Sequence, residues 1–134
     1  MKLFILFIIL AIVAAFAVGC GDSVEIIQTY FPDGTIESKV TYVKGVKNGP
    51  FVYYNDKGLK WKEGVFINDS LDGFLQFYSS NGIDTSKTSL YDHGELLEAI
   101  DYTGASVKVK SDYKNRLITI YDTSGEVDTV INMK

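Results

Sequence analysis

The feature that most constrains this sequence is a repeat with a period of 24 residues. The stretch NGPFVYYNDKG begins at Asn48, and DGFLQFYSSNG begins at Asp72, which is 72 − 48 = 24 residues later. Glycines, aromatic residues and turn-forming residues fall at matching positions in both. The same spacing relates Tyr30, Tyr54, Tyr78 and Tyr102, then Gly34, Gly58 and Gly82, and also Gly49 and Gly73. A regular period of this length predicts a stacked supersecondary unit, because one unit cannot bury its apolar face alone.

Each unit reads as strand, turn, strand, turn. Asn-Gly and Asp-Gly sequences supply the left-handed backbone that tight hairpin turns need. The stretch TIESKVTYV alternates, with Val40 and Tyr42 on one face, and PFVYY and FLQFY read as short aromatic strands. We therefore predict an all-β fold, an antiparallel β-hairpin repeat array forming one meander sheet. The predicted structural turn glycines are Gly34, Gly49, Gly58, Gly73 and Gly82.

The repeat also predicts which side chains meet. If matching positions of successive units are neighbours, Tyr53 lies near Phe77 and Tyr42 lies near Phe66, with Leu90 next in that column. The polar stretch DTSKTS in the third unit predicts that the array frays or ends there. The period fails from residue 105, so residues 105–134 are expected to form a terminal capping β-hairpin that protects the sheet edge.

The N-terminal stretch MKLFILFIILAIVAAFAVGC has the features of an export signal. Its apolar run from Leu3 to Val18 is shorter than the roughly 20 residues of a membrane span. The ending AVGC resembles the lipobox of bacterial lipoproteins, which implies cleavage before Cys20 and lipidation of that cysteine. The alternatives are an uncleaved anchor helix or an ordinary signal peptide. We expect residues 1–19 to be the signal peptide, residues 20–28 the lipidated cysteine and a tether, and the bacterial cell envelope to be the location.

The stretch GVKNGPFVYYNDKGL, from Gly45 to Leu59, resembles the MORN repeat in its bacterial variant form. The resemblance covers roughly Thr29 to Tyr102, which places the repeats at residues 29–104. It implies a hairpin-repeat fold, and related exported proteins are often described as antitoxin-like. The third unit departs from the pattern, because Leu97 stands where the second glycine of the unit is expected.

The composition argues against catalysis and against nucleic acid. His93 is the only histidine and Cys20 the only cysteine, so the chain offers no histidine pair for a metal, and we expect no metal, no cofactor and no enzyme activity. The context YDHG predicts a surface turn for His93. After removal of Lys2 with the signal, 12 Lys and Arg face 17 Asp and Glu, a net charge of 12 − 17 = −5. Phosphate binding needs a basic patch, which an acidic chain without a basic run does not predict.

Aromatic residues are the candidates for binding. Trp61 is flanked by lysines in LKWKEG, so it either packs beneath their stems or serves as an exposed anchor. Alternation along a strand predicts that Tyr53 and Tyr54 point to opposite faces. The full candidate set is Tyr53, Tyr54, Trp61, Phe77 and Tyr78. We expect a membrane-anchored scaffold that binds a protein, a glycan or another envelope partner through one sheet face. The alternative is an antitoxin or immunity protein that neutralises a toxin.

Overall fold

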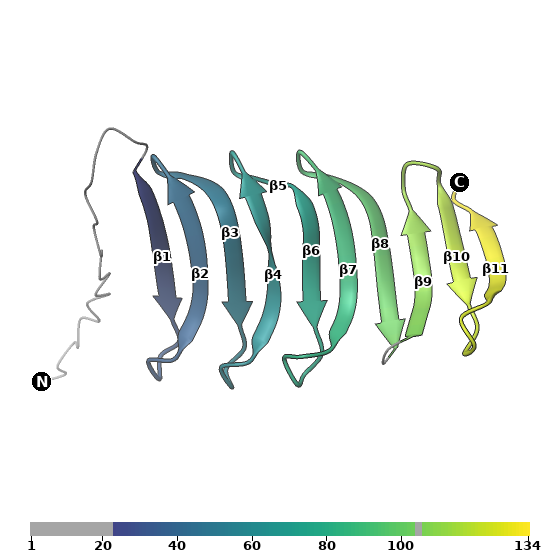
Figure 1. Cartoon of the computed structure of the whole chain (residues 1–134), viewed down its shortest axis with the longest axis horizontal. Coiled ribbons are helices and arrows are strands. Elements are labelled where there is room, and N and C mark those ends of the chain that lie inside the picture. The colour runs from purple at the N-terminus through teal and green to yellow at the C-terminus, as the bar shows by residue number, and fades with distance from the viewer. Residues whose placement is uncertain (1–22, 104–105) are drawn as a thin grey trace, which may run out of the picture.

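The computed structural model describes residues 23–103 and 106–134 as one antiparallel sheet of consecutive hairpins (Figure 1). Its strands are β1 (Val24–Tyr30), β2 (Ile36–Val43), β3 (Val46–Tyr54), β4 (Lys60–Ile67), β5 (Ser70–Leu71), β6 (Gly73–Tyr78), β7 (Thr85–Asp92), β8 (Glu95–Thr103), β9 (Ser106–Asp112), β10 (Leu117–Tyr121) and β11 (Val127–Asn132). They follow one another in sequence order, except that the short β5 pairs only with β4. The predicted all-β hairpin array is confirmed. No helix that could cross a membrane occurs in the described part.

The predicted export signal, residues 1–19, and Cys20 lie outside the described residues. The segment predicted as a tether is partly strand, because β1 starts at Val24 and pairs along its length with β2. The first hairpin therefore begins before the 24-residue period can be recognised. Among the described strands only β2 pairs with β1, and all seven residues of β1 are exposed.

Three tight turns of two residues join the strands at one end of the sheet. They are Lys44–Gly45, Asn68–Asp69 and His93–Gly94, and both residues of each turn have positive φ. This is the type I′ geometry, whose twist matches that of the flanking strands. The predicted surface turn at His93 is confirmed. The turns also tie neighbouring units together, since the Asp69 N–H donates to the Lys47 carbonyl at 2.9 Å and the Gly94 N–H to the Leu71 carbonyl at 2.8 Å.

At the opposite end, longer loops carry the glycines Gly34, Gly58 and Gly82 in the left-handed conformation, as predicted. Each loop is closed by backbone hydrogen bonds, from Phe31 N–H to the Thr35 carbonyl and from Asn55 N–H to the Leu59 carbonyl. In the third loop the bond runs from Ser79 N–H to the Asp84 carbonyl, so this loop is one residue longer. Ile83 lies in this longer loop and is exposed.

Gly49 and Gly73 do not occupy turns, which corrects their prediction. Gly49 lies inside β3, where the register shifts between Val40 and Tyr42 of β2, and Gly73 opens β6. Both have positive φ. At Gly49 a Cβ atom would lie 2.9 Å from Cγ2 of Thr41, so the bulge also requires a residue without a side chain at this position. The Asn-Gly pair was therefore a bulge signal rather than a hairpin signal.

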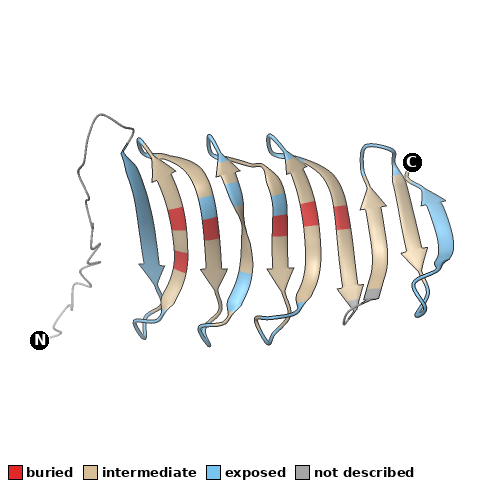
Figure 2. Cartoon of the chain, in the orientation of Figure 1, coloured by how far each residue is buried: buried red, intermediate tan, exposed pale blue. Residues whose placement is uncertain are grey.

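The core is a row of side chains across one face of the sheet, here called the core face. Val40, Phe51, Leu75 and Ala99 are buried, together with Ser38 and Ser89 (Figure 2). Register pairs Val40 with Phe51 and Phe51 with Gly64. The Phe51 ring lies over Gly64, because a Cβ atom there would stand 3.1 Å from two of its carbons. A large side chain on one strand thus uses the space left by a small residue on the next.

The predicted contact between matching positions is wrong. A unit contributes two strands, so matching positions lie two strands apart, and Lys62 stands between Tyr53 and Phe77 in the register. The ring pairs join different columns instead, with Phe51 stacked on Phe66 at 4.5 Å between centroids.

Leu90 does not continue the column of Tyr42 and Phe66. The longer loop before β7 shifts that strand by one residue, so Tyr91 packs against the core and Leu90 pairs with Phe74 on the opposite face. The third unit then regains its register, because β8 has a shorter bulge than β3, with Leu90 paired to Glu98 and Tyr91 to Leu96. Ala99 consequently falls in the core row, paired with Ser89.

The prediction that the array frays or ends at DTSKTS is wrong, because β7 pairs with both β6 and β8 along its length. The polar residues of β7 therefore belong to a strand that is hydrogen-bonded to a neighbour on each side. Residues 105–134 supply three strands rather than a single hairpin. The hairpin of β10 and β11 covers the edge of β9, and β11 becomes the last strand of the sheet.

Substitution of Gly64 by Ala tests the packing of the core row. The new methyl group would press on the Phe51 ring, which is only 4% exposed and cannot move into solvent. Overpacking costs about 1–3 kcal/mol, which exceeds the roughly 0.4–1 kcal/mol that Gly→Ala contributes through the unfolded chain. We expect a lower free energy of unfolding in urea, and a smaller effect of Gly64→Ala when Phe51→Leu is already present. Equal stability of wild type and Gly64→Ala would contradict this packing.

Candidate functional site

On the core face, near the end that carries the longer loops, two aromatic rings lie against one lysine and a third ring meets one of these two. This group, the aromatic–lysine cluster, consists of Tyr53 on β3, Trp61 and Lys62 on β4, and Phe77 on β6. The Lys62 Nζ lies 4.6 Å from the centroid of the Tyr53 ring and 4.5 Å from that of the Trp61 ring. Trp61 and Phe77 meet edge to face, with centroids 6.5 Å apart. Three of the five predicted binding residues are thereby brought together.

A bulge in β4 brings Trp61 into the cluster. Tyr53 pairs with Lys62 and Tyr54 pairs with Lys60, so Trp61 is the extra residue between two paired ones. Bulges redirect side chains in this way. Without it, Trp61 would alternate to the face opposite Lys62. The bulge therefore sets the ring beside the lysine that follows it in sequence.

The cluster is partly packed and partly open. Tyr53 and Phe77 pack against the buried core residues, which holds their rings in place. Trp61 remains 47% exposed. Trp61 is neither fully packed beneath lysine stems nor fully exposed, because Lys62 covers one part of the ring and another part faces solvent. Such a ring on a sheet offers contact area at little loss of conformational freedom, and tryptophan and tyrosine dominate binding hot spots.

Electrostatics gives the cluster its chemical character. An ammonium group over aromatic faces is held by the ring quadrupoles, an attraction of about 0.5–1 kcal/mol at exposed sites. The Tyr53 and Trp61 rings hold the ammonium group of Lys62 at a defined position. The cluster thus combines an exposed indole with an oriented cation, a suitable surface for a carboxylate that stands beside an apolar group.

The remaining two candidates, Tyr54 and Tyr78, lie on the opposite face. Tyr54 follows Tyr53 in β3 and so points away from the core face, as predicted. Here the Tyr78 hydroxyl donates to Glu63, and Lys60 Nζ donates to Glu63 Oε2 at 3.0 Å while lying over the Tyr78 ring. The hydrogen bond from Tyr78, then that from Lys60, lowers the pKa of Glu63. Burial and the Glu63 contact raise the pKa of Tyr78. The polar groups of Tyr78, Glu63 and Lys60 thus bond to one another.

Sequence reasoning missed the roles of Lys62 and Glu63. It treated the lysines beside Trp61 alike, whereas Lys60 and Lys62 serve opposite faces of the sheet. The signal that separates them is the bulge at Trp61, which a single sequence without the paired strand does not reveal. Glu63 was not considered, although its alternation relative to Lys62 places it with Tyr78.

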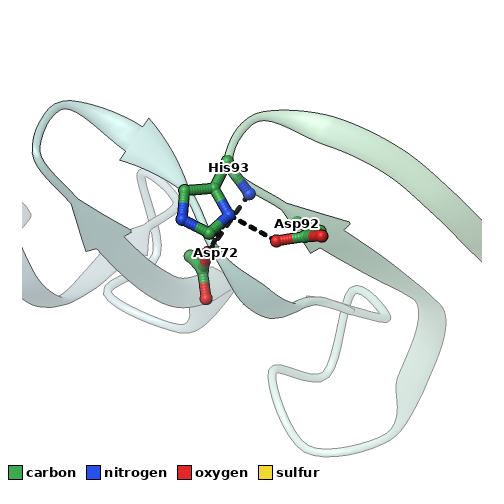
Figure 3. A group of neighbouring side chains, drawn as sticks. All are labelled: Asp72, Asp92 and His93. Atoms are coloured by element: carbon green, nitrogen blue, oxygen red, sulfur yellow. Dashed lines mark hydrogen bonds and ion pairs between the residues drawn. The ribbon is translucent and has the colours of Figure 1, made fainter.

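A second group of polar side chains lies at the type I′ turn between β7 and β8 (Figure 3). Oxygen and nitrogen atoms of Asp72, Asp92 and His93 approach within 4.8 Å of one another, close enough for a shared metal ion. The His93 Nδ1 bonds to Asp92, and the His93 N–H donates to Asp72 Oδ2 at 3.1 Å. These contacts connect the turn to the segment between β5 and β6. The three residues thus form a surface contact between two units of the repeat.

Comparison with known proteins adds no assignment. Neither the family models nor the curated proteins include a match to this chain.

The link at His93 predicts a pH-dependent contact. The Asp92 carboxylate, and then Asp72, raises the pKa of His93 above its ordinary value of 6.5. A raised pKa stabilises the folded state fully below the unfolded value, and this contribution is lost as pH rises through the folded value. NMR titration of the imidazole should give a pKa above 6.5, lowered more by Asp92→Asn than by Asp72→Asn. An unshifted titration in wild type would show that these contacts do not persist in solution.

Proposed function

We propose that this protein is a membrane-anchored lipoprotein scaffold that binds a protein partner through the core face, at the aromatic–lysine cluster. The carrying observation is the half-exposed Trp61 beside Lys62, on a sheet whose buried row holds the neighbouring rings. The consecutive hairpins support a MORN-like array as its fold family. The proposed activity is binding, without a chemical step.

The partner surface follows from the chemistry of the cluster. Large apolar rings contribute most when a partner covers them fully, and the gain grows with the apolar area removed from water. Lys62 would receive a carboxylate at the rim of that contact. Although the chain is acidic as a whole, the ammonium group of Lys62 makes this part of the face locally positive, which favours an acidic side chain of the partner at this point over a basic one. We therefore propose a protein segment in which an acidic residue lies beside an apolar one.

The anchor is inferred from the N-terminal sequence. Small residues precede the single cysteine directly after an apolar run, the arrangement of a lipidation signal. Each buried CH₂ of an acyl chain contributes about 0.8 kcal/mol of membrane affinity, so two or more chains hold a protein firmly. Lipidation at Cys20 would place the start of β1 close to the membrane surface, because only Gly21, Asp22 and Ser23 separate Cys20 from Val24.

Mass spectrometry of the protein made in a bacterial host tests the anchor. The N-terminal peptide should begin at Cys20 and carry acyl groups, and the protein should fractionate with membranes. Cys20→Ser should remove the acyl mass and leave the leader uncleaved by the lipoprotein pathway. A wild-type peptide that begins at another residue, or that starts at Cys20 without acyl groups, would contradict the lipid anchor.

Affinity capture with matched variants tests the binding face. The full-length protein, Trp61→Ala, Trp61→Phe and Ile83→Ala would each be immobilised and incubated with envelope extract, followed by quantitative mass spectrometry. Ile83 is 78% exposed in a loop between β6 and β7 and does not belong to the cluster, so Ile83→Ala is the control for loss of an exposed apolar side chain. We expect Trp61→Ala to lower capture of a specific protein at least tenfold, the effect of a typical hot-spot truncation of about 1.4 kcal/mol or more.

Two outcomes would count against the proposal. If wild type and Trp61→Ala capture the same proteins equally, the core face is not the binding surface. If wild type captures nothing beyond the background of an unrelated lipoprotein, a protein partner is wrong. Circular dichroism and thermal melting of each variant would show that a loss of capture does not reflect a loss of the sheet.

A further inference from the structure

Among the residues that the structure describes, the two outermost strands of the sheet each have one unpaired edge. β1 and β11 each have one neighbouring strand, and no other described strand lies against their outer sides. Every residue of both strands is exposed, which Figure 2 shows as two blue strands at the ends of the sheet. An exposed edge presents a row of backbone N–H and C=O groups that can pair with another chain.

Both edges carry exposed apolar side chains. Ile26 and Ile27 lie on β1 at 61% and 42% exposure, and Val130 and Ile131 lie on β11 at 54% and 45%. Proteins commonly protect such edges with lysine, proline or a bulge in the middle of the strand. Neither VEIIQTY nor VDTVIN contains a lysine or a proline, and the register of each shifts only near its loop end. Both edges therefore remain suited to strand pairing.

The two edges match in direction. All neighbouring strands on the path from β1 to β11 are antiparallel, and an odd number of such pairings makes β1 and β11 run in opposite directions (Figure 1). A second copy placed beside the first in the same orientation would set its β1 antiparallel to β11. The hairpin pattern would then continue across the junction without reversal of either face.

The side-chain rows also match. Following the register across the sheet, Ile27 and Ile131 are the two ends of the core row, and Thr29 and Thr129 are the two ends of the row beside it. If the rows continue, Ile131 pairs with Ile27 of a second copy and Thr129 pairs with Thr29. Glu25 then stands opposite Met133 and Asp128 opposite Tyr30, so no like charges face each other.

We propose that copies of this chain associate head to tail, with β11 of one copy paired to β1 of the next. An interface between two different surfaces of the same chain does not close on itself unless the rotation forms a ring, so it builds an open row. The occupant of each edge is thus a second copy of this chain.

The alternative is two-fold pairing of β1 with β1, or of β11 with β11. Each such pairing leaves the other edge of both copies open, whereas head-to-tail pairing uses both. The head-to-tail arrangement also keeps the starts of all β1 strands on one side of the extended sheet. In a β1–β1 pair these starts lie at opposite ends of the strands, about 20 Å apart at 3.3 Å per residue. This last argument rests on the proposed anchor at Cys20; the pairing argument does not.

Analytical ultracentrifugation of the full chain in detergent, with edge variants, tests the proposal. Ile27→Lys places a charge on the β1 edge and Ile131→Lys on the β11 edge, while Ile83→Lys adds the same charge away from both edges. The double variant Ile27→Lys/Ile131→Lys defines the species present when both edges are blocked, including any chance sharing of a micelle. Wild type and Ile83→Lys should form species larger than dimers that grow with protein concentration.

Mixing the two single variants distinguishes the modes of pairing. Alone, Ile27→Lys and Ile131→Lys should each sediment like the double variant. Mixed in equal amounts, they should form a dimer and nothing larger, because one free β11 edge meets one free β1 edge. Self-association of either single variant alone would overturn the proposal in favour of two-fold pairing. Wild type that sediments like the double variant at every concentration would overturn it entirely. Neither result depends on whether Trp61 binds a partner.

Discussion

The main constraint on this protein is that a single layer of strands must make its core from one of its own faces. In the described part of the chain no second sheet or helix covers the buried row. In the middle of this row large and small side chains are neighbours, with Phe51 beside Gly64 and Leu75 beside Ser89. The backbone ladder supplies continuity, and the missing side chain at Gly64 lets the Phe51 ring lie over the neighbouring strand.

The sequence allowed the class of fold and the hairpin repeat to be predicted, because turn residues and alternation are local signals. It did not allow the contacts to be predicted. Column matching assumed that Tyr53 and Phe77 touch, whereas the register inserts Lys62 between them. Bulges caused most of the remaining errors. An Asn-Gly pair reads alike in a turn and in a bulge, and only pairing with the adjacent strand shows that Gly49 belongs to the second.

The candidate site was predictable in part for the same reason. Aromatic residues were recognised individually, and three of them converge on one face. Their convergence depends on Trp61 being the unpaired residue of β4, a property of the strand pair rather than of the local sequence. The division of Lys60 and Lys62 between two faces has the same origin. A binding surface on a sheet is thus determined by register, which no single strand encodes.

The third unit contains two changes in length that compensate each other. The loop before β7 is one residue longer, and the bulge in β8 is shorter, so Ala99 returns to the row occupied by Phe51 and Leu75. A length error within a unit is therefore absorbed before it reaches the next unit. Because each unit adds two strands, inserting or deleting a whole unit would leave inside and outside unchanged. The width of such a sheet can therefore change in steps of one hairpin while the core face stays on the same side.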